Sequence, residues 1–108
     1  MRLLHLIISM AQDAIHQYPK GDFRRMLSVL AAIDTLQNPT LVRISERTGI
    51  DKKSVSRLIL QAGEQAGVVI SKTGPSYRVD DWGVVIKRSG AKLVLHGVLI
   101  SQSVEVVG

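Results

Sequence analysis

The chain has 108 residues, a formal net charge of +5 and no cysteine. A chain of this length forms one domain, and at 45% hydrophobic residues with few aromatic ones its core must be largely aliphatic. The absence of cysteine excludes a disulfide framework and a zinc site with cysteine ligands, so we expect a cytoplasmic protein. The first apolar run, residues 3–8, is interrupted by His5 and is too short for a membrane span, so no membrane partner is expected.

The N-terminal third of the chain is predicted to form two helices. Apolar residues recur at helical spacing over residues 2–17, and Pro19 and Gly21 end this pattern. A second helical pattern covers residues 23–37, directly after Asp22, whose carboxylate is a suitable N-cap.

Two shorter helices with capping signals at both ends follow. The spacing predicts a helix over 41–48 and another over 52–66. Their expected N-caps are Thr40 and Asp51, and the glycines that end them are Gly49 and Gly67. The short turn between the two helices predicts a helix-turn-helix, in which the second helix protrudes far enough to enter a DNA major groove.

The pattern then changes to one typical of strands. The runs "VVISK" and "YRVD" are separated by "TGPS", which indicates a β-hairpin, and Trp82 is expected to cover it against the helices. Residues 84–101 fit one helical face but also contain many valines and glycines; we favour a helix there, with strands as the alternative.

These elements predict a mainly α fold with a small β-hairpin, that is, a winged helix-turn-helix with additional N- and C-terminal segments. The expected organisation is an amphipathic helix and linker at 1–21, the winged helix-turn-helix domain at 22–83, and a C-terminal segment at 84–108. The buried residues expected to close the central core are Phe23, Leu27, Leu30, Ile44, Val55, Leu58, Ile59 and Trp82.

Positive charge is concentrated in the middle of the chain. Residues 40–80 carry seven basic and four acidic side chains, so +3 of the net +5 lies there. On the predicted helix 52–66, Lys53 and Arg57 lie one turn apart on the face opposite the apolar stripe, with no acidic residue three or four positions away. Two cations at this spacing repel each other, and the helix dipole disfavours positive charge close to a helix N-terminus. Each effect is mildly unfavourable. A DNA phosphate backbone would offset both effects, although a solvated basic face is the ordinary alternative.

The segment from Leu27 to Gly83, and above all "RTGIDKKSVSRLI", resembles the N-terminal winged-helix domain of IclR-type transcription regulators, and more loosely that of MarR-type ones. The resemblance implies DNA-facing positions at Lys53, Ser54, Ser56 and Arg57, with Lys72 and Arg78 flanking the wing. It also implies sequence-specific binding of double-stranded DNA in transcription regulation. Too few residues remain for the effector-binding domain of IclR-type regulators, so no small-molecule effector is expected.

The full set of predicted DNA contacts combines the exposed helix face, the turn and the wing. It comprises Thr40, Arg43, Lys52, Lys53, Ser54, Ser56, Arg57, Gln61, Lys72 and Arg78. The three histidines lack metal-ligand spacing, and no nucleophile–base constellation or phosphate-binding loop is present, so neither an enzyme nor a cofactor is expected.

Two other functions remain open. A winged helix can act as a protein–protein adaptor, for which the exposed position of Leu60 gives some support, or it can belong to a replication, partition, phage or plasmid machinery. We also expect a homodimer held by the terminal segments, because residues 2–17 and 84–101 carry more apolar surface than the central domain needs. The alternative is that these two segments pack on each other within one chain.

Overall fold

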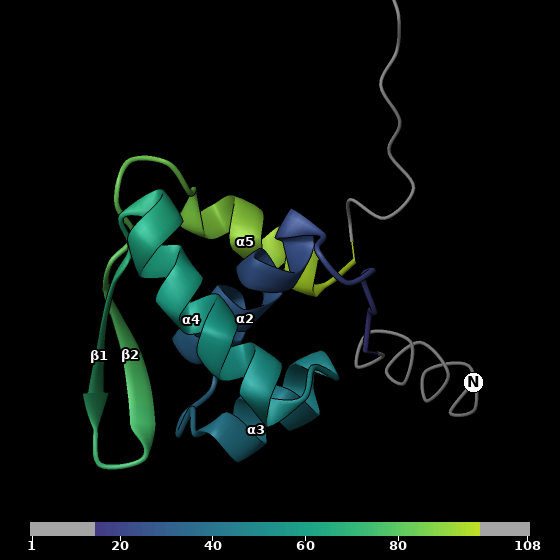
Figure 1. Ribbon diagram of the computed structural model, residues 1–108, viewed down its shortest axis with the longest axis horizontal. Coiled ribbons are helices and arrows are strands. Elements are labelled where there is room, and N and C mark those ends of the chain that lie inside the picture. Colours follow the sequence, from purple (N-terminus) through teal and green to yellow (C-terminus); the bar gives the residue numbers. More distant parts are fainter. Residues whose placement is uncertain (1–14, 98–108) are drawn as a thin grey trace, which may run out of the picture.

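The computed structural model describes residues 15–97 of the chain (Figure 1). In this part of the chain the order of elements is α2 (Phe23–Thr35), α3 (Leu41–Thr48), α4 (Lys52–Ala66), β1 (Val69–Thr73), β2 (Ser76–Asp81) and α5 (Arg88–Leu95). The prediction of a mainly α fold with a small β-hairpin is confirmed. Most of the helix predicted over 2–17 lies outside the described residues, and residues 15–17 are not helical.

Helices α3 and α4 begin and end where their capping residues lie. The Thr40 hydroxyl accepts a hydrogen bond from the Arg43 amide at 3.2 Å, and the Asp51 carboxylate accepts one from the Ser54 amide at 3.0 Å. Between the helices Gly49 has a φ of 73°, a left-handed conformation that glycine adopts without a steric penalty. The predicted bounds of both helices are therefore confirmed.

The core lies where α2 crosses α4 and α5. Helix α2 contributes a nearly continuous buried surface, whereas α4 buries one stripe and leaves the opposite side open. The buried apolar residues of the connected core are Met26, Val29, Leu30, Ala31, Ala32, Ile33, Ile44, Ile50, Val55, Leu58, Ala62, Ala66, Val68, Ile86, Ala91 and Leu95. Because α2 is enclosed on several sides, it fixes the position of α4 relative to the rest of the domain.

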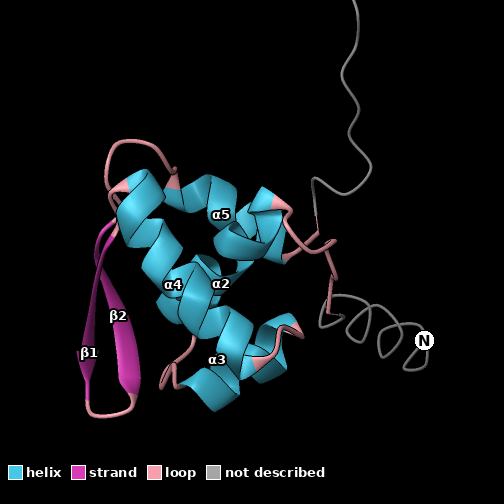
Figure 2. Cartoon of the chain, in the orientation of Figure 1, coloured by secondary structure: helices cyan, strands magenta, loops and turns pink. Residues whose placement is uncertain are grey.

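Strands β1 and β2 form an antiparallel hairpin beside the helices (Figure 2). The hairpin is attached to the loop between α2 and α3: the Tyr77 amide donates to the Pro39 carbonyl at 3.0 Å, and the Ser76 hydroxyl donates to the Asn38 side chain. Trp82, half-buried, packs against the core as predicted. The arrangement of α3, α4 and a hairpin is compatible with a winged helix.

Helix α5 is shorter than the helix favoured for residues 84–101. It covers Arg88–Leu95, preceded by a turn that begins near Gly83, and residues beyond Gly97 lie outside the described part. A side chain at Gly83, whose φ is 72°, would place a Cβ 2.8 Å from the Gly67 carbonyl oxygen, so this close approach requires glycine.

The C-terminal helix completes the domain core. Helix α5 packs extensively on α2, and Ile86, Ala91, Val94 and Leu95 are buried. The Tyr18 hydroxyl donates to the Val94 carbonyl at 2.5 Å, which joins the segment before α2 to the end of α5. Part of the surface that was expected to be free for a second chain is therefore used within this one.

Two further details differ from the predictions. Helix α2 ends at Thr35 instead of residue 37, because Leu36 adopts an extended conformation. Phe23, predicted to lie in the core, is 53% exposed. As the first residue of α2 it lies at the rim of a hollow between α2 and α5 and outside the enclosed core.

Candidate nucleic-acid interface

The exposed face of α4 carries the chemistry singled out in the sequence. Lys52, Lys53, Ser56 and Arg57 are exposed, and Gln61 is half-buried. The opposite face buries Val55, Leu58, Ala62 and Ala66 against the core. Since the apolar stripe alone fixes the rotation of α4 about its axis, the polar side chains are directed to solvent without cost to packing.

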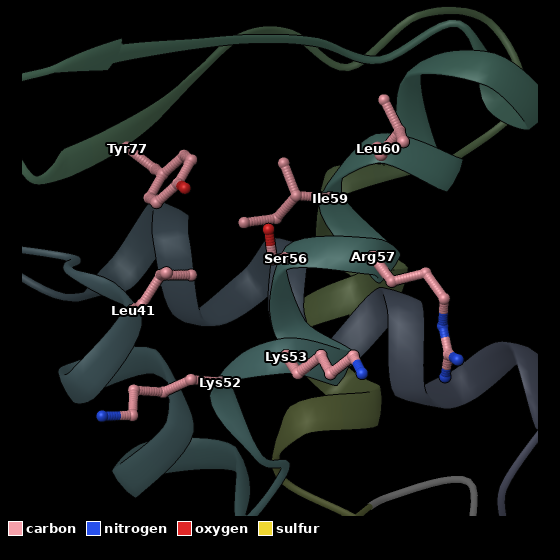
Figure 3. Close-up of a pocket in the computed structure, with 8 residues that line it drawn as sticks. All are labelled: Leu41, Lys52, Lys53, Ser56, Arg57, Ile59, Leu60 and Tyr77. Atoms are coloured by element: carbon pink, nitrogen blue, oxygen red, sulfur yellow. The ribbon is translucent and has the colours of Figure 1, made fainter.

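A groove runs between α4, the start of α3 and the hairpin (Figure 3). Its volume is about 680 Å³. The residues that line it are Leu41 from α3, Lys52, Lys53, Ser56, Arg57, Ile59 and Leu60 from α4, and Tyr77 from β2. Figure 3 shows Lys53 and Arg57 extending to the same side of α4, while Tyr77, Ile59 and Leu41 gather on the hairpin side. The groove thus has an apolar wall and a basic rim.

Among residues 15–97, no carboxylate balances the basic rim of this groove. Lys52, Lys53 and Arg57 form no salt bridge with any residue between 15 and 97. The nearest acid in sequence, Asp51, is engaged in capping α4: hydrogen bonds from the Ser54 hydroxyl and then the Ser54 amide lower the pKa of Asp51. Within the described part of the chain, the three cations therefore have no carboxylate partner.

A second, smaller hollow of about 250 Å³ flanks the other side of α4. Arg57 and Gln61 of α4 line it together with Arg25, which is on the first turn of α2. Arg25 was not predicted as a site residue. With Asp22 as the N-cap of α2, Arg25 lies on the first turn of this helix. Only the packing of α2 across α4 brings Arg25 beside Arg57.

The two wing cations have different surroundings. Lys72 pairs across the hairpin with Tyr77, and its ammonium nitrogen lies 5.3 Å from the centre of the Tyr77 ring, which lines the groove. Arg78 pairs with Ser71 and therefore lies on the other face of the hairpin, where its Nε is 2.7 Å from the Asp80 carboxylate. Hydrogen bonds from Ser71 and from Arg78 lower the pKa of Asp80. Lys72 thus borders the groove through its contact with Tyr77, and the charge of Arg78 is partly balanced.

Three other predicted residues lie outside the groove. Ser54 is 8% exposed, and its hydroxyl donates to the Asp51 carboxylate at 2.7 Å. The side chain is directed to the cap and away from solvent, whereas the family resemblance implied a DNA-facing position. Thr40 is engaged as the N-cap of α3, and Arg43 is exposed on α3 without lining either hollow.

Nothing in the described part of the chain suggests a metal or a membrane. Between residues 15 and 97 no three histidine or acidic side chains gather closely enough to hold a metal ion. Over the same residues no helix has both the length and the apolar character to cross a membrane.

Comparison with known proteins adds no further constraint. The chain matches no protein-family model, no curated protein and no solved structure. The resemblance to IclR-type regulators therefore stays a prediction made from the motif residues.

Proposed function

We propose that this chain binds double-stranded DNA sequence-specifically, as a small cytoplasmic transcriptional regulator of the IclR-like winged-helix type. The observation that carries the proposal is the set of three exposed cations on α4, Lys52, Lys53 and Arg57, none of which is paired with a described carboxylate. Unpaired cations beside a groove form a favourable surface for a polyanion.

In the proposed complex α4 lies in the major groove. Lys53, Ser56 and Arg57, on its exposed face, reach base edges or phosphates, and Gln61 and Arg25 extend the contact on the second side. Lys72 contacts the backbone next to the groove, where phosphate contacts set the orientation of the protein without reading sequence.

Salt-dependent binding to duplex DNA tests the proposal. With Lys52, Lys53, Arg57 and Lys72 at phosphates, a plot of log K against log salt should have a slope of roughly −3 to −4. Selection of bound sites from random duplex should then enrich a defined sequence. A slope near zero, or no binding in low salt, would refute the proposal.

A protein–protein adaptor is the second candidate, and one observation favours it. The apolar wall of the groove, formed by Leu41, Ile59, Leu60 and Tyr77, is the kind of surface that receives a partner's apolar side chains. This candidate predicts that selection from random duplex enriches no sequence, because only non-specific attraction of the basic surface would remain, whereas the DNA proposal predicts a defined sequence, so the selection experiment separates them.

We further propose that the DNA-binding form is a homodimer. The support is an exposed apolar surface on the α2–α5 side: Phe23 is 53% exposed, Val85 66% and Leu93 47%. Phe23 and Val85 line a hollow of about 220 Å³ there. Ile86 was expected to contribute to this surface but is buried in the core. A two-fold dimer would present two copies of α4 to a palindromic site about one DNA turn, ~34 Å, apart.

Light scattering at micromolar concentration tests the dimer. The parent chain should have the mass of two chains, and Val85→Lys should reduce it towards one because a charge would be buried at the interface. Val69→Lys is the matched control, since Val69 is 53% exposed on β1 and lies outside the hollow. A parent chain that is monomeric well above its DNA-binding concentration would exclude the dimer.

A further inference from the structure

Leu60 is an exposed leucine on the basic face of α4. It is 62% exposed, and it lies one helical turn beyond Ser56 and Arg57 in the groove that these residues line (Figure 3). Isolated apolar residues on a protein surface are common and need no explanation in themselves. The position of Leu60 is of interest because the leucine lies among the cations proposed to contact DNA.

Packing does not account for a leucine at this position. The core contacts of α4 are made by Val55, Leu58 and Ala62, with Ile59 partly buried beside them. A glutamine or lysine at residue 60 would favour the helix about as well and would leave less apolar surface in water. The Leu60 side chain is therefore available to contact a molecule bound in the groove.

The surroundings of Leu60 favour DNA over a protein as that partner. Lys52 and Lys53 line the same groove, and Lys72 borders it above the Tyr77 ring. Lysine is depleted in protein–protein interfaces, and charged residues are depleted at the centres of such interfaces. In a DNA complex, by contrast, lysines around an apolar contact can bind the phosphates on either side of it.

In a major groove the thymine C5-methyl is the apolar group that a leucine can contact. Lys53 and Leu60 are seven residues apart, which is about two helical turns or roughly 10 Å along the helix axis, so they face different base pairs of the same groove. The inference depends on the proposed function: given that α4 enters the major groove, we propose that Leu60 contacts a thymine methyl and so makes the chain select thymine at one position of the site that α4 reads.

Replacement of thymine by deoxyuridine tests this contact. Deoxyuridine lacks the C5-methyl but keeps the O4 acceptor and the base pairing, so it removes only the proposed contact. In a duplex selected by the parent chain, each thymine would be replaced in turn. We expect about a fourfold loss of affinity at one or two positions, as for the loss of one buried methyl group.

The Leu60→Ala variant supplies the second half of the test. It should bind the thymine duplex more weakly than the parent chain and show no further loss on deoxyuridine replacement at those positions. Leu93→Ala, which removes a leucine of similar exposure from α5, is the matched control and should keep the position-specific loss whatever its overall affinity. Leu60→Gln should behave as Leu60→Ala does, with folding checked by the thermal transition.

The outcomes distinguish the inference from the function on which it depends. A parent chain that binds no duplex overturns both. A parent chain that binds a selected duplex with no deoxyuridine effect, or a Leu60→Ala variant that keeps the effect, overturns the thymine contact and leaves DNA binding intact. Unchanged duplex affinity in Leu60→Ala also overturns the contact.

Discussion

Helices α4 and α5 each carry two basic residues one turn apart, but the surroundings of these charges differ. On α5, the Arg88 Nε lies 2.9 Å and the Lys92 Nζ 3.4 Å from the same Asp34 carboxylate oxygen, and the Asp34 side chain is only 13% exposed. On α4, Lys53 and Arg57 have the same spacing and no salt bridge with residues 15–97.

The comparison shows why a count of charges does not locate a binding surface. Both pairs contribute equally to the net charge, and both satisfy the same helical spacing. The pair on α5 joins α5 to α2 through Asp34, so its charge is partly balanced within the domain. The pair on α4 has no such role among residues 15–97, which is why we propose that an external anion binds at the groove beside it.

The largest expected effect comes from neutralising the α4 pair. The double variant Lys53→Gln, Arg57→Gln should bind duplex DNA at least roughly 25-fold more weakly, because each lost contact costs about 1 kcal/mol or more. The salt slope should become less steep by about two units. Fluorescence anisotropy over a series of salt concentrations measures both quantities.

The matched control is Arg88→Gln, Lys92→Gln, which lowers the net charge by the same amount. It should keep duplex affinity within about twofold and should lower the free energy of unfolding by up to about 1 kcal/mol, since the pairs with Asp34 are partly exposed. Equal losses of affinity in the two double variants would show that net charge, and not the α4 surface, drives binding.

The wing offers a second, smaller contrast of the same kind. Lys72→Ala should weaken duplex binding by about fivefold, because it removes an unbalanced charge at the groove. Arg78→Ala should change affinity less than twofold, because Asp80 already balances Arg78 on the other face of the hairpin. Titration of both variants with one duplex decides this, and a larger loss for Arg78→Ala would place the opposite face of the wing on DNA.

The starts of the two helices also differ. Asp51 caps α4 with its side chain, whereas Lys87, at the N-cap of α5, makes no side-chain cap bond. Lys87 has the extended conformation that an N-cap requires, so Lys87→Ser should raise the free energy of unfolding by about 1 kcal/mol and the melting temperature by about 5 °C. Lys87→Ala is the control, since it removes the same charge without supplying a cap. Equal melting temperatures for the two variants would contradict the capping argument.

The smallest effect concerns the pH dependence of the α4 cap. Hydrogen bonds from Ser54 hold the pKa of Asp51 below its ordinary value of 3.8, so the unfolded chain takes up this proton first as the pH falls. The contribution of the carboxylate is fully present above about pH 5 and is lost progressively as the pH falls through 4 and below. Thermal unfolding of the parent chain and of Asp51→Asn from pH 7 to 2.5 should therefore show a stability difference that shrinks at low pH. A difference that stays constant would show that Asp51 does not titrate as described.

The elements that the sequence predicts best are those with chemical signals at both ends. Thr40, Gly49, Asp51 and Gly67 define the ends of α3 and α4, because a capping side chain or a left-handed glycine acts locally. The exposed face of α4 follows from these ends and the apolar stripe.

The elements and residues that were mispredicted depend on contacts between distant segments. Ser54, which the family resemblance placed at a DNA-facing position, is buried because its hydroxyl bonds to the Asp51 cap. Phe23, predicted in the core, is exposed at the rim of the hollow between α2 and α5. Arg25 joins the candidate site only through the crossing of α2 and α4. The paired state of Arg88 and Lys92 likewise depends on where α5 packs, which their helical spacing does not determine.

The attachment of the hairpin to the loop between α2 and α3 bears on the thermodynamics of any complex. The Tyr77 amide bond to Pro39 and the Ser76 bond to Asn38 hold β2 beside the helices before a ligand arrives. A wing held in this way loses little conformational entropy when it meets its target, so more of the contact energy remains as affinity. The same two bonds restrain the distance between Tyr77 and α4 in the free protein, so the groove is expected to favour ligands whose cross-section already fits it.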